Sequence, residues 1–303
     1  MSPEGRERLS TVLLAAYYGL FLLFLYGPMI VMIILSLQDS RGGATFPARG
    51  LVDSFWYDDL GSASQAAVRE AIGTSLVLAV VVGLVGGLLS LSLSMAYRRL
   101  GRFSTPLMYL VLLSLMTPGL LLSLGLLFWW DLLGLGTPEL YPTVLGAQVV
   151  WALPFGFLVM LSIFNRYDES VEEAARDLGA SAAETFFRVT LPIVWAGVFG
   201  ATLFGFVLSW NEFERTLLIA TTATLPIEIF SQLTTSVLRP SLYALGAITT
   251  VGTLVMVLVV TVITGLIVRR NTRAQARADA ALAGTGLEEV TEAGSPAQPA
   301  PAG

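Results

Sequence analysis

The sequence has 303 residues, of which 55% are hydrophobic and only 13% are charged, and its net charge is −5. A soluble domain carries roughly 25% charged residues, so this composition excludes an ordinary soluble protein and indicates an integral membrane protein. The chain has no Cys, no His and no Lys, and its 17 basic residues are all Arg, which excludes disulfides, thiol and imidazole chemistry and a Walker A loop, since that loop needs a Lys.

Six apolar runs are long enough to span a bilayer, which takes about 20 residues. In chain order they cover residues 12–37, 72–97, 106–130, 143–164, 193–210 and 247–268. They predict an all-α integral membrane fold with six transmembrane helices. Pro28, Pro118 and Pro154 lie within these runs and predict kinks. Gly83, Gly86 and Gly87 predict close packing of the second helix against a neighbour.

The distribution of Arg predicts the orientation, because cytoplasmic loops carry more basic residues. One set of loops holds most of the Arg residues, and the opposite set holds only Arg41, Arg49, Arg69, Arg215 and Arg239. Both termini are therefore expected in the cytoplasm. Residues 1–11 form the N-terminus, residues 12–270 form the six-helix domain, and residues 271–303, rich in Ala, Gly, Pro and Glu, predict a disordered cytoplasmic tail.

The first outer loop, residues 38–70, is long and carries aromatic and acidic residues, among them Phe55, Trp56 and Asp58. Two interpretations stay open. The loop either forms a short amphipathic segment on the outer surface or is an ordinary loop with interfacial aromatic residues.

A cytoplasmic insert lies between the fourth and fifth helices, within residues 166–192. Ser170 with Glu173 and Ser181 with Glu184 both have the spacing of a capping box, which marks a helix start. Gly179 between them suits the left-handed conformation that ends a helix. The insert is therefore predicted to be two short helices at an angle, the second continuing into the fifth membrane helix. Its small residues indicate a docking surface for another protein; the alternative is a solvated helix without a partner.

The insert also resembles a known motif. Glu173, Ala174, Ala175, Gly179 and the pair Leu191-Pro192 match the EAA loop of the permease subunits of bacterial ATP-binding-cassette importers. The resemblance implies a type I importer permease fold, in which this loop is the coupling helix. It also implies that a separate ATPase dimer binds ATP and Mg and drives the membrane helices through the loop.

Other segments are similar to the spermidine/putrescine permeases, most closely to the second of their two permease subunits. The likeness covers roughly residues 12–270 and is carried by Met116-Thr117-Pro118 and by the segments 208–213, 225–230 and 241–245. Two departures weaken a polyamine assignment. Gly119 stands where an acid is expected, and the segment 210–213 also resembles sugar permeases.

Polar residues at the end of the fifth helix, together with Trp151 in the first half of the fourth, are candidates for the substrate pathway, because polar groups within a membrane usually face a cavity. The candidates are Glu212, Asn211, Ser209 and Trp151. Glu212 would guide a cation electrostatically. In the alternatives, the acids are solvated at the outer surface, Arg215 neutralises Glu214, and Trp151 and Gln148 serve packing.

The sequence thus predicts a multi-pass permease of the bacterial inner membrane that imports polyamines by alternating access and is not itself an enzyme. Its expected partners are the ATPase dimer, a second and distinct permease chain, an extracytoplasmic binding protein and lipid, but no nucleic acid. Another small organic solute, such as a sugar, amino acid derivative, phosphonate or thiamine-like cation, is the alternative. An intramembrane enzyme and an ATP-independent transporter are the competing classes; the first lacks a pair of carboxylates at useful spacing, and the second does not need the insert.

Overall fold

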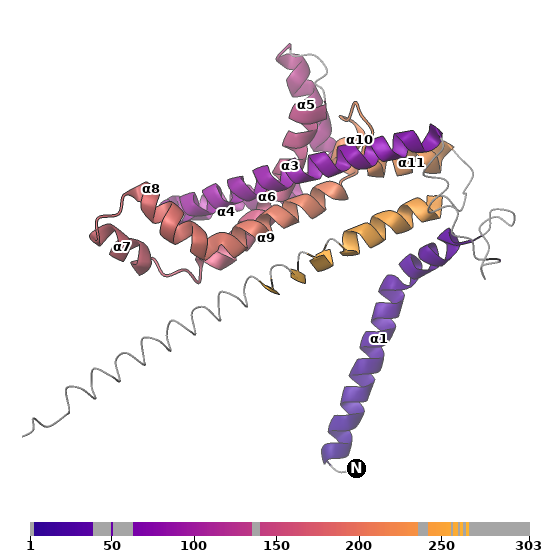
Figure 1. Ribbon diagram of the computed structural model, residues 1–303, viewed down its shortest axis with the longest axis horizontal. Coiled ribbons are helices and arrows are strands. Elements are labelled where there is room, and N and C mark those ends of the chain that lie inside the picture. The colour runs from indigo at the N-terminus through magenta and orange to yellow at the C-terminus, as the bar shows by residue number, and fades with distance from the viewer. Residues whose placement is uncertain are drawn as a thin grey trace, which may run out of the picture. The chain divides into compact units, whose positions relative to one another are not determined.

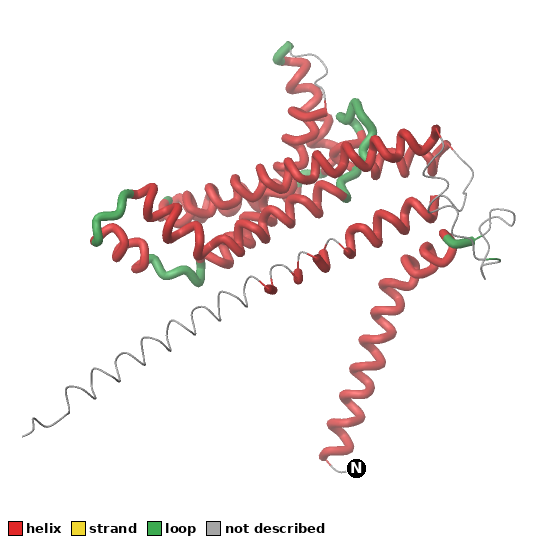
Figure 2. The backbone as a smooth tube through the Cα atoms, viewed as in Figure 1, coloured by secondary structure: helices red, strands yellow, loops and turns green. Residues whose placement is uncertain are grey.

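The computed structural model describes residues 3–38, 50, 63–134, 140–235, 242–255, 257–259, 261, 262, 265 and 266. Within these residues the regular elements are helical (Figure 2). The chain divides into two compact units, Met1–Leu254 and Val255–Gly303. The described residues of the second unit are helical, and the two sites described below lie in the first. Its elements are α1 (Pro3–Ser36), α3 (Ala63–Arg99), η3 (Gly101–Phe103), α4 (Ser104–Leu113), η4 (Ser114–Met116), α5 (Gly119–Leu132), α6 (Leu140–Phe164), α7 (Ser170–Asp177), α8 (Ala182–Thr185), η5 (Phe186–Thr190), α9 (Leu191–Trp210), α10 (Glu214–Leu217) and α11 (Leu225–Thr235).

Five described helical segments are long and apolar enough to span a membrane, and a sixth span is possible as a bent pair. The five are Ser10–Ser36, Ala66–Arg99, Thr143–Phe164, Ala182–Trp210 and Leu242–Val259. The pair is Gly101–Met116 with Gly119–Leu132, bent by 101°. The prediction of an all-helical membrane fold is therefore confirmed.

The third predicted span, residues 106–130, is wrong as a single kinked helix, because it is two helices. The break lies at Thr117, whose backbone is extended, with φ −76° and ψ 118°. Pro118 has no N–H to donate to the preceding turn, and its ring disfavours the helical conformation at the residue before it. Pro154, in contrast, lies within the unbroken α6.

Several helix boundaries extend beyond the predicted membrane spans. α1 begins at Pro3 and α3 at Ala63. The insert between α6 and α9 runs without interruption from α8 through the π-helical turn η5 into α9, which confirms that its second helix continues into the membrane. The two interpretations of the outer loop concern residues that lie mostly outside the described part, and so does the predicted tail.

Three helices, α3, α6 and α9, pack side by side and form the core of the first unit (Figure 1). A Cβ atom on Gly83 of α3 would lie 2.7 Å from the carbonyl oxygen of Thr202 on α9, and one on Gly205 would lie 3.0 Å from the Cα of Gly83. Such distances leave no room for a side chain, so the two backbones touch. The predicted close packing is confirmed for Gly83 and also for Gly87, which faces Thr202. Gly86 is buried as well, but a Cβ atom there would meet nothing within 4 Å, so no close backbone contact is found at Gly86.

The core itself is apolar and the outer faces of the same helices are apolar as well. Leu78 and Val82 of α3 pack with Val144 and Ala147 of α6 in one buried cluster, and a second cluster surrounds Met160. Large apolar side chains of the same helices are also exposed, among them Leu88 of α3 at 60%, Leu158 of α6 at 41% and Phe204 of α9 at 47%. This pattern is expected where lipid, not water, covers the outer faces.

Replacement of Gly83 by Val tests the backbone contact between α3 and α9. The new side chain must push the helices apart, and overpacking of this kind costs about 1–3 kcal/mol of unfolding free energy. We expect a lower thermal unfolding temperature for the protein in nanodiscs. Gly73→Val, on the same helix but at an exposed position where a Cβ atom would meet nothing within 4 Å, is the control and should leave that temperature nearly unchanged. Equal effects of the two substitutions would contradict the assignment of the contact to Gly83.

Candidate functional site

The insert between α6 and α9 turns at Gly179, whose φ of +90° lies in the left-handed region that favours glycine. The N–H of Ala180 donates to the carbonyl oxygen of Ala175, and that of Gly179 to Arg176. These two bonds make a Schellman motif that closes α7. The predicted hinge at Gly179 is confirmed.

The two predicted capping boxes differ in outcome. The Ser181 hydroxyl accepts from the Glu184 N–H at 3.3 Å, and the Ser181 N–H donates to the Glu184 carboxylate at 3.0 Å, so the second box is confirmed. The first is wrong. Ser170 is already inside α7, its predecessor Glu169 is the N-cap, and the Ser170 N–H donates to Asp168 instead.

The tip of the insert presents the predicted docking residues to the outside. Glu173, Ala174 and Gly179 are exposed, Ala175 is half-buried, and Leu178 is 90% exposed. At the start of α9, Leu191 is half-buried and Pro192 is exposed. An exposed leucine beside small residues offers an apolar surface that a protein partner can bury. The docking role of these residues stays a prediction.

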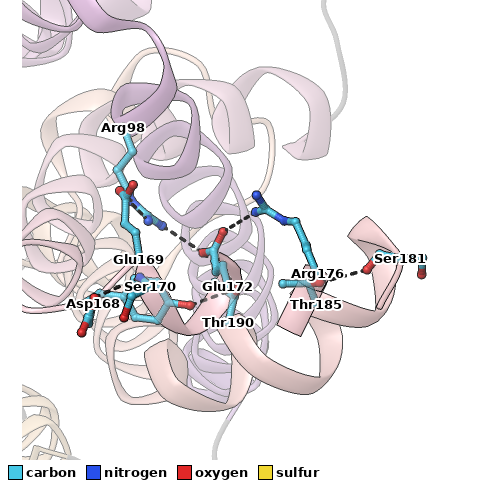
Figure 3. A network of polar contacts seen from close by, with 10 residues as sticks. Arg98, Asp168, Glu169, Ser170, Glu172, Arg176, Ser181, Thr185 and Thr190 are labelled. Atoms are coloured by element: carbon cyan, nitrogen blue, oxygen red, sulfur yellow. Dashed lines mark hydrogen bonds and ion pairs between the residues drawn. The ribbon is translucent and has the colours of Figure 1, made fainter. Parts of the chain in front are cut away.

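Behind this surface, Glu172 of α7 is buried and holds the insert to the membrane helices (Figure 3). Its carboxylate accepts from Arg176 at 2.8 Å, from the Thr190 hydroxyl at 3.1 Å and from Arg98 at 3.4 Å. Arg98 ends α3, and Thr190 precedes α9. One carboxylate therefore connects α7 with both of the closely packed helices.

The guanidinium of Arg98 is held from several sides. It donates to Glu169 at 2.7 Å through one terminal nitrogen, and its central carbon lies 4.7 Å from the ring centroid of Phe164 and 4.9 Å from that of Tyr167. A cavity of about 300 Å³ borders Arg98, Glu172 and Arg176. Arg98 thus joins α3 to the insert through ion pairs and cation–π contacts together.

Burial alone would raise the pKa of the Glu172 carboxyl. The hydrogen bond from Thr190 and the charge of Arg98 outweigh burial and hold this pKa below its ordinary value. The carboxylate is thus ionised in the folded protein. The sequence does not predict this network, because nothing local joins Arg98 to Glu172, 74 positions away.

A second polar cluster surrounds Glu212, which lies between α9 and α10. Figure 1 shows α10 at the end of α9 away from the insert. Glu212 and Arg215 are each only 6% exposed. One terminal nitrogen of Arg215 donates to both oxygens of the Glu212 carboxylate, at 3.1 and 3.0 Å, and the Arg215 backbone N–H donates to it at 2.9 Å. The alternative in which Glu212 is simply solvated is therefore wrong.

Two other predicted pathway residues, Trp151 and Ser209, belong to the same cluster. The guanidinium carbon of Arg215 lies 3.9 Å from the ring centroid of Trp151. The Ser209 hydroxyl donates to Gln148, and Gln148 donates to Thr216 at 2.9 Å. We call these six residues, Gln148, Trp151, Ser209, Glu212, Arg215 and Thr216, the buried polar site.

Asn211 does not join the buried polar site. It is exposed, its side chain donates to the Val207 carbonyl oxygen at 2.9 Å, and it borders a separate cavity of about 310 Å³ beside Phe213 and Phe230. Glu214 is also exposed. The expectation that Arg215 neutralises Glu214 is wrong, because Arg215 is paired with Glu212.

The structure explains why position 119 is occupied by glycine. A Cβ atom there would lie 2.9 Å from a carboxylate oxygen of Glu214 and 3.2 Å from the Cγ of Arg215. Gly119 begins α5, right after the break at Pro118. The carboxylate of Glu214 thus lies where a side chain at position 119 would begin, and a larger residue there would displace it.

Neither site has the composition of a metal centre. Among the residues that the structure describes, no group of three or more Asp, Glu, His or Cys side chains could hold a metal ion. The contacts that the structure shows in the two sites are ion pairs, hydrogen bonds and cation–π contacts.

Comparisons with known proteins match this architecture. Residues 88–273 match the family model described as binding-protein-dependent transport system inner membrane component. The chain is 28% identical over 233 residues to the putrescine transport system permease protein PotI of Escherichia coli K12, covering 74% of this chain and 81% of that one. It is 27% identical over 253 residues to the spermidine/putrescine transport system permease protein PotC of Haemophilus influenzae, covering 82% and 93%.

A solved structure shows the same fold. It is a bacterial alginate ABC transporter in complex with an alginate pentasaccharide-bound periplasmic protein. The TM-score is 0.63 at 17% identity, and the match covers 88% of this chain and 96% of that one. The predicted permease fold is confirmed.

Replacement of Glu172 by Gln should loosen the insert from α3 and α9. The substitution leaves Arg176 and Thr190 without their ionised acceptor, which costs about 1–3 kcal/mol for a buried group. We expect a lower thermal unfolding temperature and faster proteolysis within the insert. Glu173→Gln, one position away and exposed, is the matched control and should change neither. Identical behaviour of the two variants would rule out the network as a structural tie.

The stabilisation by Glu172 should depend on pH. Its pKa is lower in the folded protein than in the unfolded chain, so its contribution is complete above the unfolded value of about 4.3 and is lost as the pH falls through the lower folded value. The difference in unfolding temperature between the unsubstituted protein and Glu172→Gln should therefore shrink below about pH 4. A difference that stays constant from pH 7 to pH 3 would contradict this sign.

Proposed function

Because the chain belongs to the family of binding-protein-dependent transport system inner membrane components, we propose that it is the permease subunit of an ATP-driven importer of polyamines. The observation that supports this most is the coupling surface: an exposed Leu178 beside Gly179, on an insert tied to α3 and α9 by Arg98 and Glu172. A chain with no Lys has no Walker A loop of its own, and such a surface gives it a place to receive movement from an ATPase.

The polyamine assignment is supported by the relatives. PotI is a putrescine and PotC a spermidine/putrescine permease by name, and each matches about three quarters or more of this chain. The alginate transporter shares the fold at 17% identity but imports an acidic polysaccharide, so fold alone does not select the solute. The polyamine assignment therefore rests on the sequence relatives, which are 27–28% identical over most of the chain.

The proposed transport cycle uses the two ends of α9. An ATPase dimer closes on ATP and moves the insert, and α9 carries the movement to the buried polar site at its other end. A second, related permease chain supplies the other half of the pathway. An extracytoplasmic binding protein delivers the solute, and both termini of this chain lie in the cytoplasm.

One observation favours the alternative, a different small organic solute. Arg215 neutralises the buried Glu212, so the buried polar site has no net charge with which to attract a dication. Glu214, which is exposed and lies beside Gly119, is an acid next to this site that forms no ion pair with any described residue.

The solute is tested with the complete transporter in proteoliposomes. We expect putrescine or spermidine, delivered by the binding protein, to stimulate ATP hydrolysis and to accumulate inside, while a neutral sugar and an acidic oligosaccharide do neither. Binding protein without solute is the control. Stimulation by the sugar and not by polyamines would refute the polyamine assignment while keeping the importer class.

The coupling surface is tested at Leu178. Leu178→Ala removes an apolar side chain that a partner would bury, which costs about 2–3 kcal/mol of binding free energy. We expect weaker co-purification with the ATPase and loss of solute-stimulated ATP hydrolysis, with an unchanged unfolding temperature. Leu132→Ala is the matched control, because Leu132 is 78% exposed at the far end of α5. A normal stimulated rate in Leu178→Ala would exclude this residue from the coupling surface.

A further inference from the structure

The buried polar site has the chemistry of an ammonium site, and it is already filled by a side chain of the protein. A carboxylate from Glu212 lies against the guanidinium of Arg215 at 3.0 Å, and the ring of Trp151 lies across its face at 3.9 Å. A carboxylate beside an aromatic face is also the arrangement that binds alkylammonium ligands. Arg215 therefore occupies the position that a cationic solute would take.

Because the Glu212 carboxylate is buried, it needs a cation beside it at every stage of transport. Glu212 is only 6% exposed. A buried carboxylate without a counter-charge is strongly unfavourable. A solute ammonium can enter only if it replaces the charge that it displaces. Exchange between Arg215 and the solute satisfies this condition, because Glu212 is paired before and after.

The local structure is suited to such an exchange. Arg215 is carried by α10, a helix of four residues, and the flanking residues 211–213 and 218–224 are not helical. The guanidinium is therefore attached to a short turn and not to a membrane-spanning helix. A change of side-chain rotamer moves it away from Trp151 without moving α9.

Resting on the proposed polyamine function, we propose that Arg215 is a tethered cation: the solute ammonium displaces it from Glu212 and Trp151, and its return drives the ammonium out. Arg215 is thus a specificity-determining residue. A solute can bind Glu212 only if it carries a cation that replaces the Arg215 guanidinium. Competition from this guanidinium also keeps the solute from binding too tightly to be released.

The experiment measures binding and uptake separately. Tritiated putrescine is titrated onto the permease–ATPase complex in nanodiscs without the binding protein, and its uptake is measured in proteoliposomes with the binding protein. The variants are Arg215→Gln and the neutral pair Glu212→Gln with Arg215→Gln. Arg69→Gln, which removes an exposed arginine of α3, is the control.

Removal of the competing guanidinium should make Arg215→Gln bind putrescine about tenfold more tightly, a change equivalent to about 1.4 kcal/mol, and should slow uptake because release is impaired. The neutral pair should lose the gain in affinity and most of its uptake. Arg69→Gln should match the unsubstituted complex in both measurements.

Two results would overturn the proposal. If Arg215→Gln binds putrescine no more tightly, the guanidinium does not compete. If the neutral pair takes up putrescine at the unsubstituted rate, the ion pair serves only to position α10. The uptake of the neutral pair decides the question even where Arg215→Gln alone fails to assemble. If the unsubstituted complex itself neither binds nor imports polyamines, the proposed function fails first, and the two failures are thereby distinguished.

Discussion

The contact between the backbones of α3 and α9 is the constraint on which both sites depend. Gly83 and Gly205 remove the side chains that would separate the two helices. Arg98 at the end of α3 is thereby brought to the insert that precedes α9, and Glu172 can bind Arg98 and Thr190 together. At its other end, α9 leads directly into the segment that carries Glu212 and Arg215. With 20 residues and a rise of 1.5 Å per residue, α9 separates the two sites by about 30 Å, roughly the thickness of the bilayer core.

Both sites use arginine in the same way. Arg98 pairs with Glu169 and Glu172 and lies over Phe164 and Tyr167; Arg215 pairs with Glu212 and lies over Trp151. A planar guanidinium donates within its plane and presents its faces to aromatic rings, which a lysine ammonium cannot do. A chain whose 17 basic residues are all Arg can therefore hold buried cations by two kinds of contact at once. What differs is the setting: Glu169 is largely open to water, whereas Glu212 and Arg215 are enclosed together.

The sequence predicts correctly those features that depend on residues close together in the chain. The turn at Gly179 follows from its freedom at positive φ, and the cap at Ser181 from a spacing of three residues to Glu184. The same spacing failed at Ser170, because Asp168 competes for its N–H and starts the helix one residue earlier. Pro118 predicts a disruption, but the bend of 101° and the contact of α5 with α10 that accompanies it involve a segment about 100 positions away, which no local pattern specifies. The partners of Arg98 and of Gln148 come from distant parts of the chain, and no local pattern specifies them.

The π-helical turn between the insert and α9 has a consequence for evolution. A π-turn contains one residue more than the α-helical turn that it replaces. The π-helical turn η5 (Phe186–Thr190) therefore sets the rotation of the insert about the axis of α9. Loss of one residue there would restore a regular helix and rotate everything before it by about 100° around the axis of α9. Glu172 would then face away from Thr190. Substitutions between Gly179 and Leu191 that keep the Ser181–Glu184 cap and the Thr190 hydroxyl leave the orientation of the insert unchanged, whereas insertions and deletions rotate the whole insert about the axis of α9. We therefore expect changes in the length of this segment to be tolerated less well than such substitutions.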